Sequence, residues 1–148
     1  MPMKEIFQTP IGSVAVQTDG GVVQEVHLGA RGRPQAVSTP VARDLARYFS
    51  GESVDFGRYD VDLSGYTEFE RKVYAATRRI PPGEVRTYGD IARAIGKPGA
   101  SRAVGNALGK NPACIVIPCH RVVASDGLGG FTGGLAWKRR LLHLEGSP

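Results

Sequence analysis

Cysteine is scarce in this sequence. Only Cys114 and Cys119 occur among its 148 residues. A disulfide framework needs more cysteines, and the four residues between these two would close a very small loop. No Cys-x-x-Cys pair is present and the three histidines are scattered, so the pattern typical of a zinc site is missing as well. We therefore expect neither a structural disulfide nor a bound metal.

Long apolar runs are also missing. No segment approaches the length needed to span a bilayer. Residues 1–12 contain no apolar stretch after a basic one, so a secretory signal is not expected. Apolar residues still make up 41% of the chain, which is enough to bury a core. The sequence predicts a soluble, cytoplasmic protein (nuclear in a eukaryote) with no membrane contact, and we take a monomer as the expected state.

Acidic residues are few in the second part of the chain. Residues 66–148 hold 13 Lys and Arg but only 6 Asp and Glu, a net charge of +7, whereas residues 1–65 carry −2. A basic excess confined to one region favours a polyanionic partner there. A solvated basic surface has the same composition, so charge alone leaves nucleic acid and plain surface equally open.

The first part of the chain alternates strand and turn signals. Residues 12–18 and 22–28 alternate apolar and polar side chains, and Asp19-Gly20-Gly21 between them predicts a hairpin. Residues 30–38 predict a loop, and Thr39-Pro40 predicts the start of a helix that runs to Gly51. Residues 53–65 are polar and aperiodic. We interpret them as a linker that ends a first domain, 1–65, before a second domain, 66–148.

The second part predicts three helices in succession. Thr67 and Glu70 form a capping-box pattern for the first, which should end at Pro81. Thr87 caps the second, which Gly96 should stop, and the third is expected over residues 99–109. Two short helices around a glycine-containing turn indicate a helix-turn-helix.

One face of the third helix is unusually bare. Its inner face is expected to hold Ala100, Ala103, Val104, Ala107 and Leu108, and its outer face Arg102, Gly105, Asn106 and Gly109. Glycines weaken a helix by roughly 1 kcal/mol each relative to alanine. They offer either a smooth surface for another molecule, with one cation standing out of it, or a packing surface for a neighbouring helix. The helix alone leaves both interpretations equally open.

Cys119 and His120 are adjacent after Pro118, at the end of an apolar run. A turn at Pro118 could direct both side chains toward one site. A thiol becomes a nucleophile as its thiolate, and a neutral histidine can accept its proton directly or through water. A buried structural cysteine beside a hydrogen-bonded histidine is the more common outcome for a bare Cys-His pair.

The surrounding motif changes that balance. Pro118-Cys119-His120-Arg121-Val122, preceded by Asn111-Pro112 and by Ser101-Arg102-Ala103-Val104-Gly105, strongly resembles the O6-alkylguanine-DNA alkyltransferases, also called methylated-DNA–protein cysteine methyltransferases. The resemblance covers about residues 66–145. The first 65 residues resemble the small N-terminal domain of the family only loosely.

The resemblance implies a fold and an activity. The fold is an α/β N-terminal ribonuclease-H-like domain followed by a mostly α C-terminal winged helix-turn-helix-like domain. The activity is the repair of DNA by direct, irreversible, single-turnover transfer of the alkyl group from O6-alkylguanine to Cys119, with O4-alkylthymine as a second candidate substrate. No cofactor is implied. The partner is double-stranded DNA, bound through the minor groove with the alkylguanine flipped out, because a thiol cannot reach guanine O6 inside a stacked duplex.

Catalytic roles follow from the same resemblance. Cys119 matches the nucleophile, and His120 matches the base that acts through water. Glu145, at the end of the last expected helix, matches the carboxylate behind that histidine. Asn111 matches the hinge asparagine that ties the recognition helix to the active site.

The DNA-binding and pocket positions also follow from it. Arg102 matches the arginine finger that fills the base stack, Tyr88 the tyrosine that helps rotate the nucleotide, and Ser125 a position that contacts the DNA backbone. Phe131 and Thr132 fall in the wall of the guanine pocket, formed by residues 127–134. Phe131 lacks the hydroxyl that some relatives have there, and the loop is about one residue shorter than the family pattern. Some relatives bind zinc in the N-terminal domain, but no cysteine precedes Cys114 here.

Two other functions fit parts of the sequence. A binding module that recognises alkylguanine without transfer would have lost the nucleophile, whereas Cys119 is present. A cysteine hydrolase built on Cys119, His120 and Glu145 would turn over. The run Lys138-Arg139-Arg140 is expected to be a solvated helix face.

Overall fold

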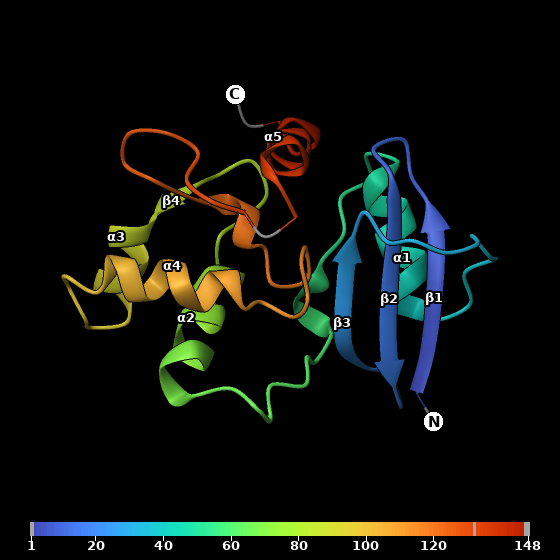
Figure 1. Ribbon diagram of the computed structural model, residues 1–148, viewed down its shortest axis with the longest axis horizontal. Helices are drawn as coiled ribbons and strands as arrows, with labels where there is room; N and C mark the ends of the chain where they lie inside the picture. Colours follow the sequence, from blue (N-terminus) through green and yellow to red (C-terminus); the bar gives the residue numbers. More distant parts are fainter. Residues whose placement is uncertain (1, 132, 147–148) are drawn as a thin grey trace. The chain divides into compact units, whose positions relative to one another are not determined.

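The computed structural model describes residues 2–131 and 133–146. The chain divides into two compact units (Figure 1). The first comprises Met1–Asp62 together with Pro112–Val116, and the second comprises Leu63–Asn111 and Ile117–Pro148. The chain therefore returns to the first unit for five residues just before it reaches Cys119. A single boundary after residue 65, as the sequence suggests, does not describe this return.

An antiparallel sheet with one helix beside it makes up most of the first unit (Figure 1). Its strands are β1 (Pro2–Gln8), β2 (Ser13–Asp19) and β3 (Val22–Leu28), in that order across the sheet. The predicted hairpin is confirmed. Gly20 and Gly21 have φ of 60° and 85°, the left-handed conformation that a two-residue hairpin turn requires.

The helix α1 (Pro40–Phe49) begins where the sequence predicts. The Thr39 side chain accepts a hydrogen bond from the backbone N–H of Ala42, and Pro40 occupies the first turn. Glu5 of β1 is buried and accepts hydrogen bonds from Ser38 and Thr39. These bonds hold the pKa of Glu5 below its ordinary value against the opposing effect of burial. The sheet and the helix are thus joined through one carboxylate.

Residues 53–65 were expected to form a linker, and the structure corrects this for residues 53–62. They contain the short 3-10 helix η1 (Phe56–Arg58), whose Phe56 is buried. The backbone N–H of Val23 donates to Asp60 O at 2.8 Å, and that of Asp62 donates to Val23 O at 2.8 Å. The segment through Asp62 therefore pairs with β3 and belongs to the first unit.

Helices and two short strands make up the second unit. The helices are α2 (Glu68–Arg78), α3 (Tyr88–Ala94), α4 (Ser101–Gly109), the 3-10 helix η2 (Cys119–Arg121) and α5 (Leu135–Leu144). The strands β4 (Arg86–Thr87) and β5 (Val122–Val123) pair in parallel. Both expected N-caps are confirmed: Thr67 and Thr87 each form a complete capping box, with Glu70 and Asp90 respectively.

The core of the second unit forms where α2 and α4 pack. Val73 and Tyr74 of α2 and Val104 of α4 are fully buried. The Tyr74 hydroxyl donates a 2.7 Å hydrogen bond to the carbonyl oxygen of Ala107. Ala103 was expected on the inner face of α4 and is exposed instead. The third helix is thus anchored by a narrower apolar stripe than the sequence suggests.

Among the described residues, none of the helices has both the length and the apolar character to cross a membrane.

Candidate active site around Cys119

Two very tight turns precede and present Cys119. The backbone N–H of Val116 donates to Cys114 O at 2.9 Å, which closes a three-residue turn centred on Ile115. Ile115 has a φ of 76°, a strained conformation for a β-branched residue. The N–H of Cys119 likewise donates to Ile117 O at 2.8 Å, around Pro118 with φ −80° and ψ 64°. These angles define an inverse γ-turn.

Asn111 fixes the second of these turns. Its side-chain Nδ2 donates to the carbonyl oxygen of Ile117 at 2.8 Å. The same carbonyl accepts the N–H of Cys119. Asn111 follows α4 directly, so its side chain joins the end of that helix to the turn that carries the thiol.

His120 is completely buried behind Cys119 and bonded to a carboxylate. Its Nε2 lies 2.8 Å from Glu145 Oε2. Glu145 is the C-cap of α5, which places its side chain at the end of that helix. The carboxylate also accepts two hydrogen bonds from Arg121, from Nε at 2.9 Å and from Nη2 at 2.8 Å. Arg121 Nη1 donates to Ile80 O at 2.7 Å, so the guanidinium is held in place on two sides.

This arrangement makes His120 a neutral base. Burial lowers the pKa of His120 below its ordinary value, and the Glu145 carboxylate acts in the opposite direction. Because Nε2 donates to Glu145, the lone pair of the neutral ring is on Nδ1. That atom is buried and has no hydrogen-bond partner in the described part of the chain. It is therefore available to accept a proton.

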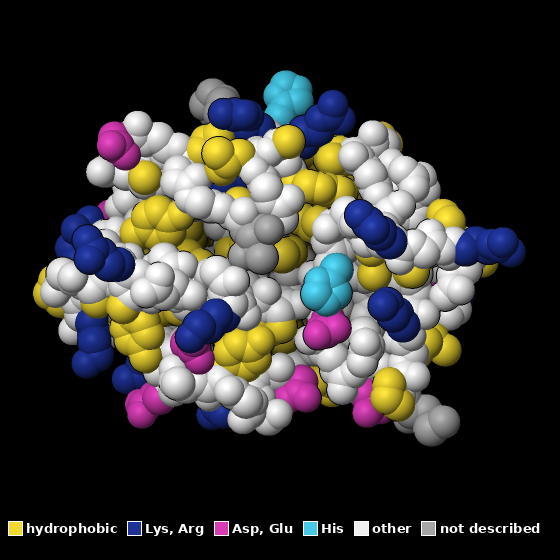
Figure 2. Space-filling view, viewed as in Figure 1, with side chains coloured by type: hydrophobic (Ala, Val, Ile, Leu, Met, Phe, Trp, Pro, Cys, Tyr) yellow, Lys and Arg dark blue, Asp and Glu magenta, His cyan; other side chains and the backbone are white. Residues whose placement is uncertain are grey.

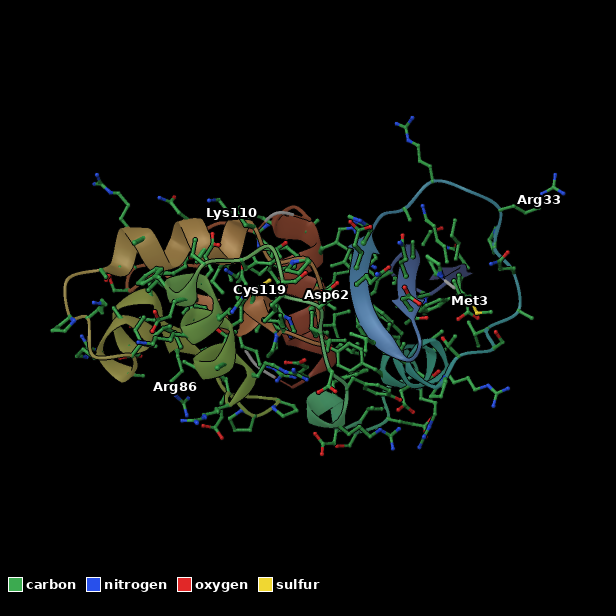
Figure 3. All side chains as sticks on the ribbon, turned by 90° about the horizontal axis from the view of Figure 1, so that it is seen from below. Met3, Arg33, Asp62, Arg86, Lys110 and Cys119 are labelled. Carbon is green, nitrogen blue, oxygen red and sulfur yellow. The ribbon has the colours of Figure 1, made fainter. Side chains whose placement is uncertain are left out.

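Cys119 lines a cavity of about 140 Å³ in the second unit. The other lining residues come from α3, α4 and the loop 127–134: Tyr88, Gly105, Leu108, Gly109, Gly130 and Phe131. Figure 3 shows Cys119 in the interior of the second unit, whereas Arg86 and Lys110 lie near its surface. A small group entering this cavity would meet the sulfur.

The loop over the cavity is held by Tyr88. The backbone N–H of Gly130 donates to Tyr88 Oη at 3.2 Å. At Gly129, with φ 73°, a Cβ atom would lie 2.5 Å from the same hydroxyl oxygen. Only glycine allows the loop to approach the ring this closely.

The outer face of α4 is bare, as the sequence predicts. A Cβ added at Gly109 would meet nothing within 4 Å, and one at Gly105 would make only ordinary contact with the Tyr88 ring, at 3.8 Å. Packing inside the described structure therefore does not require either glycine. This favours the interpretation that they leave room for another molecule.

Arg102 and Ser125 are exposed, and neither lines the cavity. Figure 2 shows Lys and Arg side chains gathered where α4 begins. Two of the three predicted DNA-binding residues thus lie on the outside, whereas the third, Tyr88, lines the cavity with Cys119. No group of three or more His, Cys, Asp or Glu side chains in the described residues could hold a metal ion.

Residues 68–147 match the model described as the 6-O-methylguanine DNA methyltransferase, DNA binding domain. A methylated-DNA–protein-cysteine methyltransferase of Methanosarcina acetivorans is 41% identical over 156 aligned positions, which cover 96% of this chain and 97% of that protein. The chain belongs to this family.

Further relatives agree with the assignment. The methyltransferase of Mycolicibacterium paratuberculosis is 50% identical over 113 residues, covering 76% of this chain and 67% of that protein. A solved structure of the Mycobacterium tuberculosis protein in complex with DNA matches with a TM-score of 0.84 and 38% identity, over 97% of this chain and 92% of that one. The protein from Pyrococcus kodakaraensis matches with a TM-score of 0.75 and 30% identity, over 99% of both chains. The mixed α/β fold is therefore that of the family.

The structure brings several of the predicted site residues together. Cys119, Tyr88 and Phe131 share the cavity, His120 is bonded to Glu145, and Asn111 holds the turn. Thr132, the other predicted pocket residue, lies outside the described residues.

Two buried cations were missed as contributors to the site. Arg121 was noted only as part of the motif, yet it binds the same carboxylate as His120. Lys138 was expected on a solvated face and is completely buried. Lys138 lies three residues before Leu141 and four before Leu142, and both leucines are buried. This helical spacing places Lys138 on the apolar face of α5 and could have indicated its burial.

Proposed function

We propose that this protein repairs DNA by transferring the alkyl group of O6-alkylguanine to Cys119, irreversibly and once per molecule, with O4-alkylthymine as a second candidate substrate. One observation carries the proposal: Cys119 lines a cavity, and directly behind it His120 is bonded to Glu145 and keeps an unpartnered Nδ1. The relatives are named as proteins that act on methylated DNA through a cysteine.

Activation of the thiol is the first step. His120 accepts the proton of Cys119 at Nδ1, directly or through a water molecule. Glu145 holds the imidazole in the tautomer that has this lone pair and stabilises the imidazolium that forms. The proton moves within the site, so a thiolate and an imidazolium replace two neutral groups.

Transfer then exchanges one bond for another. The thiolate attacks the alkyl carbon, the S–C bond forms and the C–O6 bond breaks. The electron pair of the broken bond stays on guanine, which takes up a proton, and His120 returns to its neutral form. The product on Cys119 is a thioether, which offers water no good leaving group. The protein is therefore consumed.

The surface of α4 supports recognition of double-stranded DNA through the minor groove. The two glycines leave a smooth face, and the exposed Arg102 stands at its start. A guanine inside the stack is out of reach of a buried thiol, so the nucleotide must rotate into the cavity. In this proposal Arg102 fills the gap in the stack, Tyr88 assists the rotation, and Ser125 contacts the DNA backbone.

The pocket residues take the extruded base. Phe131 lines the cavity with Cys119 and offers its ring, and Thr132 is proposed to supply a hydroxyl. Asn111 keeps the turn that carries the thiol attached to the recognition helix α4.

The finer description of the fold belongs to the same proposal. We interpret the first unit as a ribonuclease-H-like domain and the second as a winged helix-turn-helix domain, with α3 and α4 as the helix pair. We propose a monomer that acts in the cytoplasm, or in the nucleus of a eukaryote.

A titration tests the proposed function. A duplex containing one O6-methylguanine is mixed with increasing amounts of protein, and the remaining lesion is counted while the protein is weighed by mass spectrometry. We expect one lesion removed per protein and one added methyl group, located on Cys119 by peptide mapping. Repeated turnover would indicate a hydrolase, and binding without any mass increase would indicate a recognition module. Either result would overturn the proposal.

A further inference from the structure

Lys138 is a completely buried cation in the second unit. Its Nζ donates to two backbone carbonyl oxygens, that of Val122 at 2.7 Å and that of Gly130 at 2.9 Å. In the described part of the chain no Asp or Glu forms an ion pair with it, and Glu145 of the reactive site is bonded to His120 and Arg121. Burying a charge without an opposite charge costs free energy, so the burial of Lys138 requires an explanation.

The two carbonyls belong to two segments that each contribute a residue to the lining of the reactive cavity. Val122 directly follows the turn of Cys119, His120 and Arg121. Gly130 belongs to the loop that lines the cavity together with Cys119 and Phe131. Lys138 therefore ties the chain that carries the sulfur to the loop that faces it. The N–H of Gly130 is held by Tyr88, so the loop is fixed from both directions.

A thiolate on Cys119 is a negative charge that the site itself can produce. Burial lowers the pKa of Lys138 to about 8, and the electrostatic attraction of Cys119 acts in the opposite direction. The coupling is mutual, because a cation that is favoured by a thiolate also favours that thiolate. Other titratable or charged groups of the site keep their effect in any variant of Lys138: His120 and Arg121 of η2, Glu145 at the end of α5, Tyr74 of α2 and Tyr88 of α3.

We propose that Lys138 is a positioning residue that holds the pocket loop over Cys119 and stabilises the Cys119 thiolate from inside the protein. The inference deepens the proposed function and rests on it for the alkyl transfer. Lys138 supplies the positive charge while the sulfur is an anion. After transfer the sulfur is a neutral thioether, and the charge of Lys138 has lost its partner.

Two variants separate the effect of the Lys138 charge from the effect of its hydrogen bonds to the two carbonyl oxygens. Lys138→Met removes both the charge and the hydrogen bonds, and Lys138→Gln removes the charge but keeps an amide donor for a carbonyl. Arg139→Met is the matched control, because Arg139 is the next residue of α5 and is exposed. It removes the same charge from the solvent side.

The first measurement needs no guanine chemistry. Each variant is treated with iodoacetamide across a pH series, and the adduct on Cys119 is followed by peptide mapping, which distinguishes it from Cys114. In both Lys138 variants we expect the midpoint of the rate profile to move up by about one pH unit, which is about a tenfold loss of rate at neutral pH. The control should match the wild type. Unchanged midpoints in both Lys138 variants would overturn the inference.

The second measurement is the rate of reaction with O6-benzylguanine. After correction for the fraction of thiolate, Lys138→Gln should react faster than Lys138→Met, because only Gln can still hold the loop. Equal corrected rates would remove the positioning role. If the wild-type protein reacts neither with benzylguanine nor with a duplex that contains O6-methylguanine, the proposed function fails, while the iodoacetamide profiles still decide the role of the charge. If Lys138→Met does not fold, the pH profile of Lys138→Gln alone decides the role of the charge, because this variant retains a hydrogen-bond donor.

Discussion

Replacing Glu145 by Gln should impair both the chemistry and the stability of the protein, and the two effects can be separated. The carboxylate accepts one hydrogen bond from His120 and two from Arg121. A carboxamide has one acceptor oxygen, and its NH₂ group must face a donor. The substitution therefore leaves His120 without an anion and Arg121 without its counter-charge.

The loss of stability comes from Arg121. It is only 7% exposed, and Glu145 is its ion-pair partner. Removing one partner of a buried ion pair costs about 3–5 kcal/mol. Since a domain is stable by about 5–15 kcal/mol in total, Glu145→Gln is expected to fold at room temperature with a clearly lower unfolding temperature.

A double variant removes this complication. Arg121→Met combined with Glu145→Gln replaces the buried cation by an apolar side chain of similar length. Such replacements of whole buried ion pairs are often neutral or stabilising. Besides the ion pair with Glu145, the hydrogen bond to Ile80 is also lost, at about 1 kcal/mol. The double variant should recover most of the stability and still lack the carboxylate that His120 needs.

The loss of rate comes from His120. Glu145 raises the pKa of His120 against the effect of burial, so without the carboxylate that pKa falls further and the base weakens. The expected loss of rate at neutral pH is between about 10² and 10⁴-fold, the range for a general base and for a triad deprived of its carboxylate. As the pH rises toward about 8.5, solvent removes the thiol proton and the difference should narrow.

The assay is single-turnover alkylation by O6-benzylguanine from about pH 6 to about pH 9, which brackets the two titrations involved. Wild type, Glu145→Gln and the double variant are compared, with thermal unfolding curves for each. If the double variant is as stable as the wild type and shows the same rate and pH profile, Glu145 has only a structural role and our reasoning about His120 is wrong.

Three further outcomes are expected. Cys119→Ala should abolish transfer while binding to alkylated duplex DNA persists, as measured by mass spectrometry and a gel-shift titration; an adduct on another residue would contradict this. Arg102→Ala should slow repair in duplex DNA much more than reaction with free O6-benzylguanine, because a free base leaves no gap in a stack; equal slowing would point to a role in folding. Gly129→Ala should lose about 1–3 kcal/mol of stability from its positive φ and its clash with Tyr88, and should react more slowly. Gly127→Ala, where a Cβ meets nothing within 4 Å, is the control, and similar unfolding curves for both would refute the argument.

Local signals in the sequence predicted local structure well. Thr39, Thr67 and Thr87 cap helices as expected, because an N-cap depends on residues three positions apart. The hairpin at Gly20 and Gly21 depends equally on its own backbone. Such features need no knowledge of the rest of the chain.

Features that depend on distant residues were missed. The strand β1 has a buried Glu5 on its inner face, which conceals the alternation of apolar and polar residues typical of a strand. The hydrogen-bond partners of its carboxylate, Ser38 and Thr39, are 33 and 34 residues away. The pairing of Val23 with Asp60 and Asp62 is likewise invisible in a polar, aperiodic segment. Lys138 was assigned to the surface because charged side chains are rarely buried.

The candidate site shows the same limit. The adjacent Cys119 and His120 alone left a structural pair as the better interpretation, and Glu145 lies 25 residues beyond His120. The resemblance of the whole motif placed these residues in roles. The unpartnered Nδ1 and the buried partners Arg121 and Lys138 required the three-dimensional arrangement.

The turn at Pro118 also bears on how the substrate range can change. The carbonyl of Ile117 is bound by both the N–H of Cys119 and the side chain of Asn111, so the backbone under the sulfur has almost no freedom to adjust to a larger alkyl group. Across the cavity, five of the eight residues in the segment 127–134 are glycine. Adaptation to bulkier adducts, in evolution or by directed selection of a self-labelling protein, should therefore accumulate in that segment and leave the reactive turn untouched.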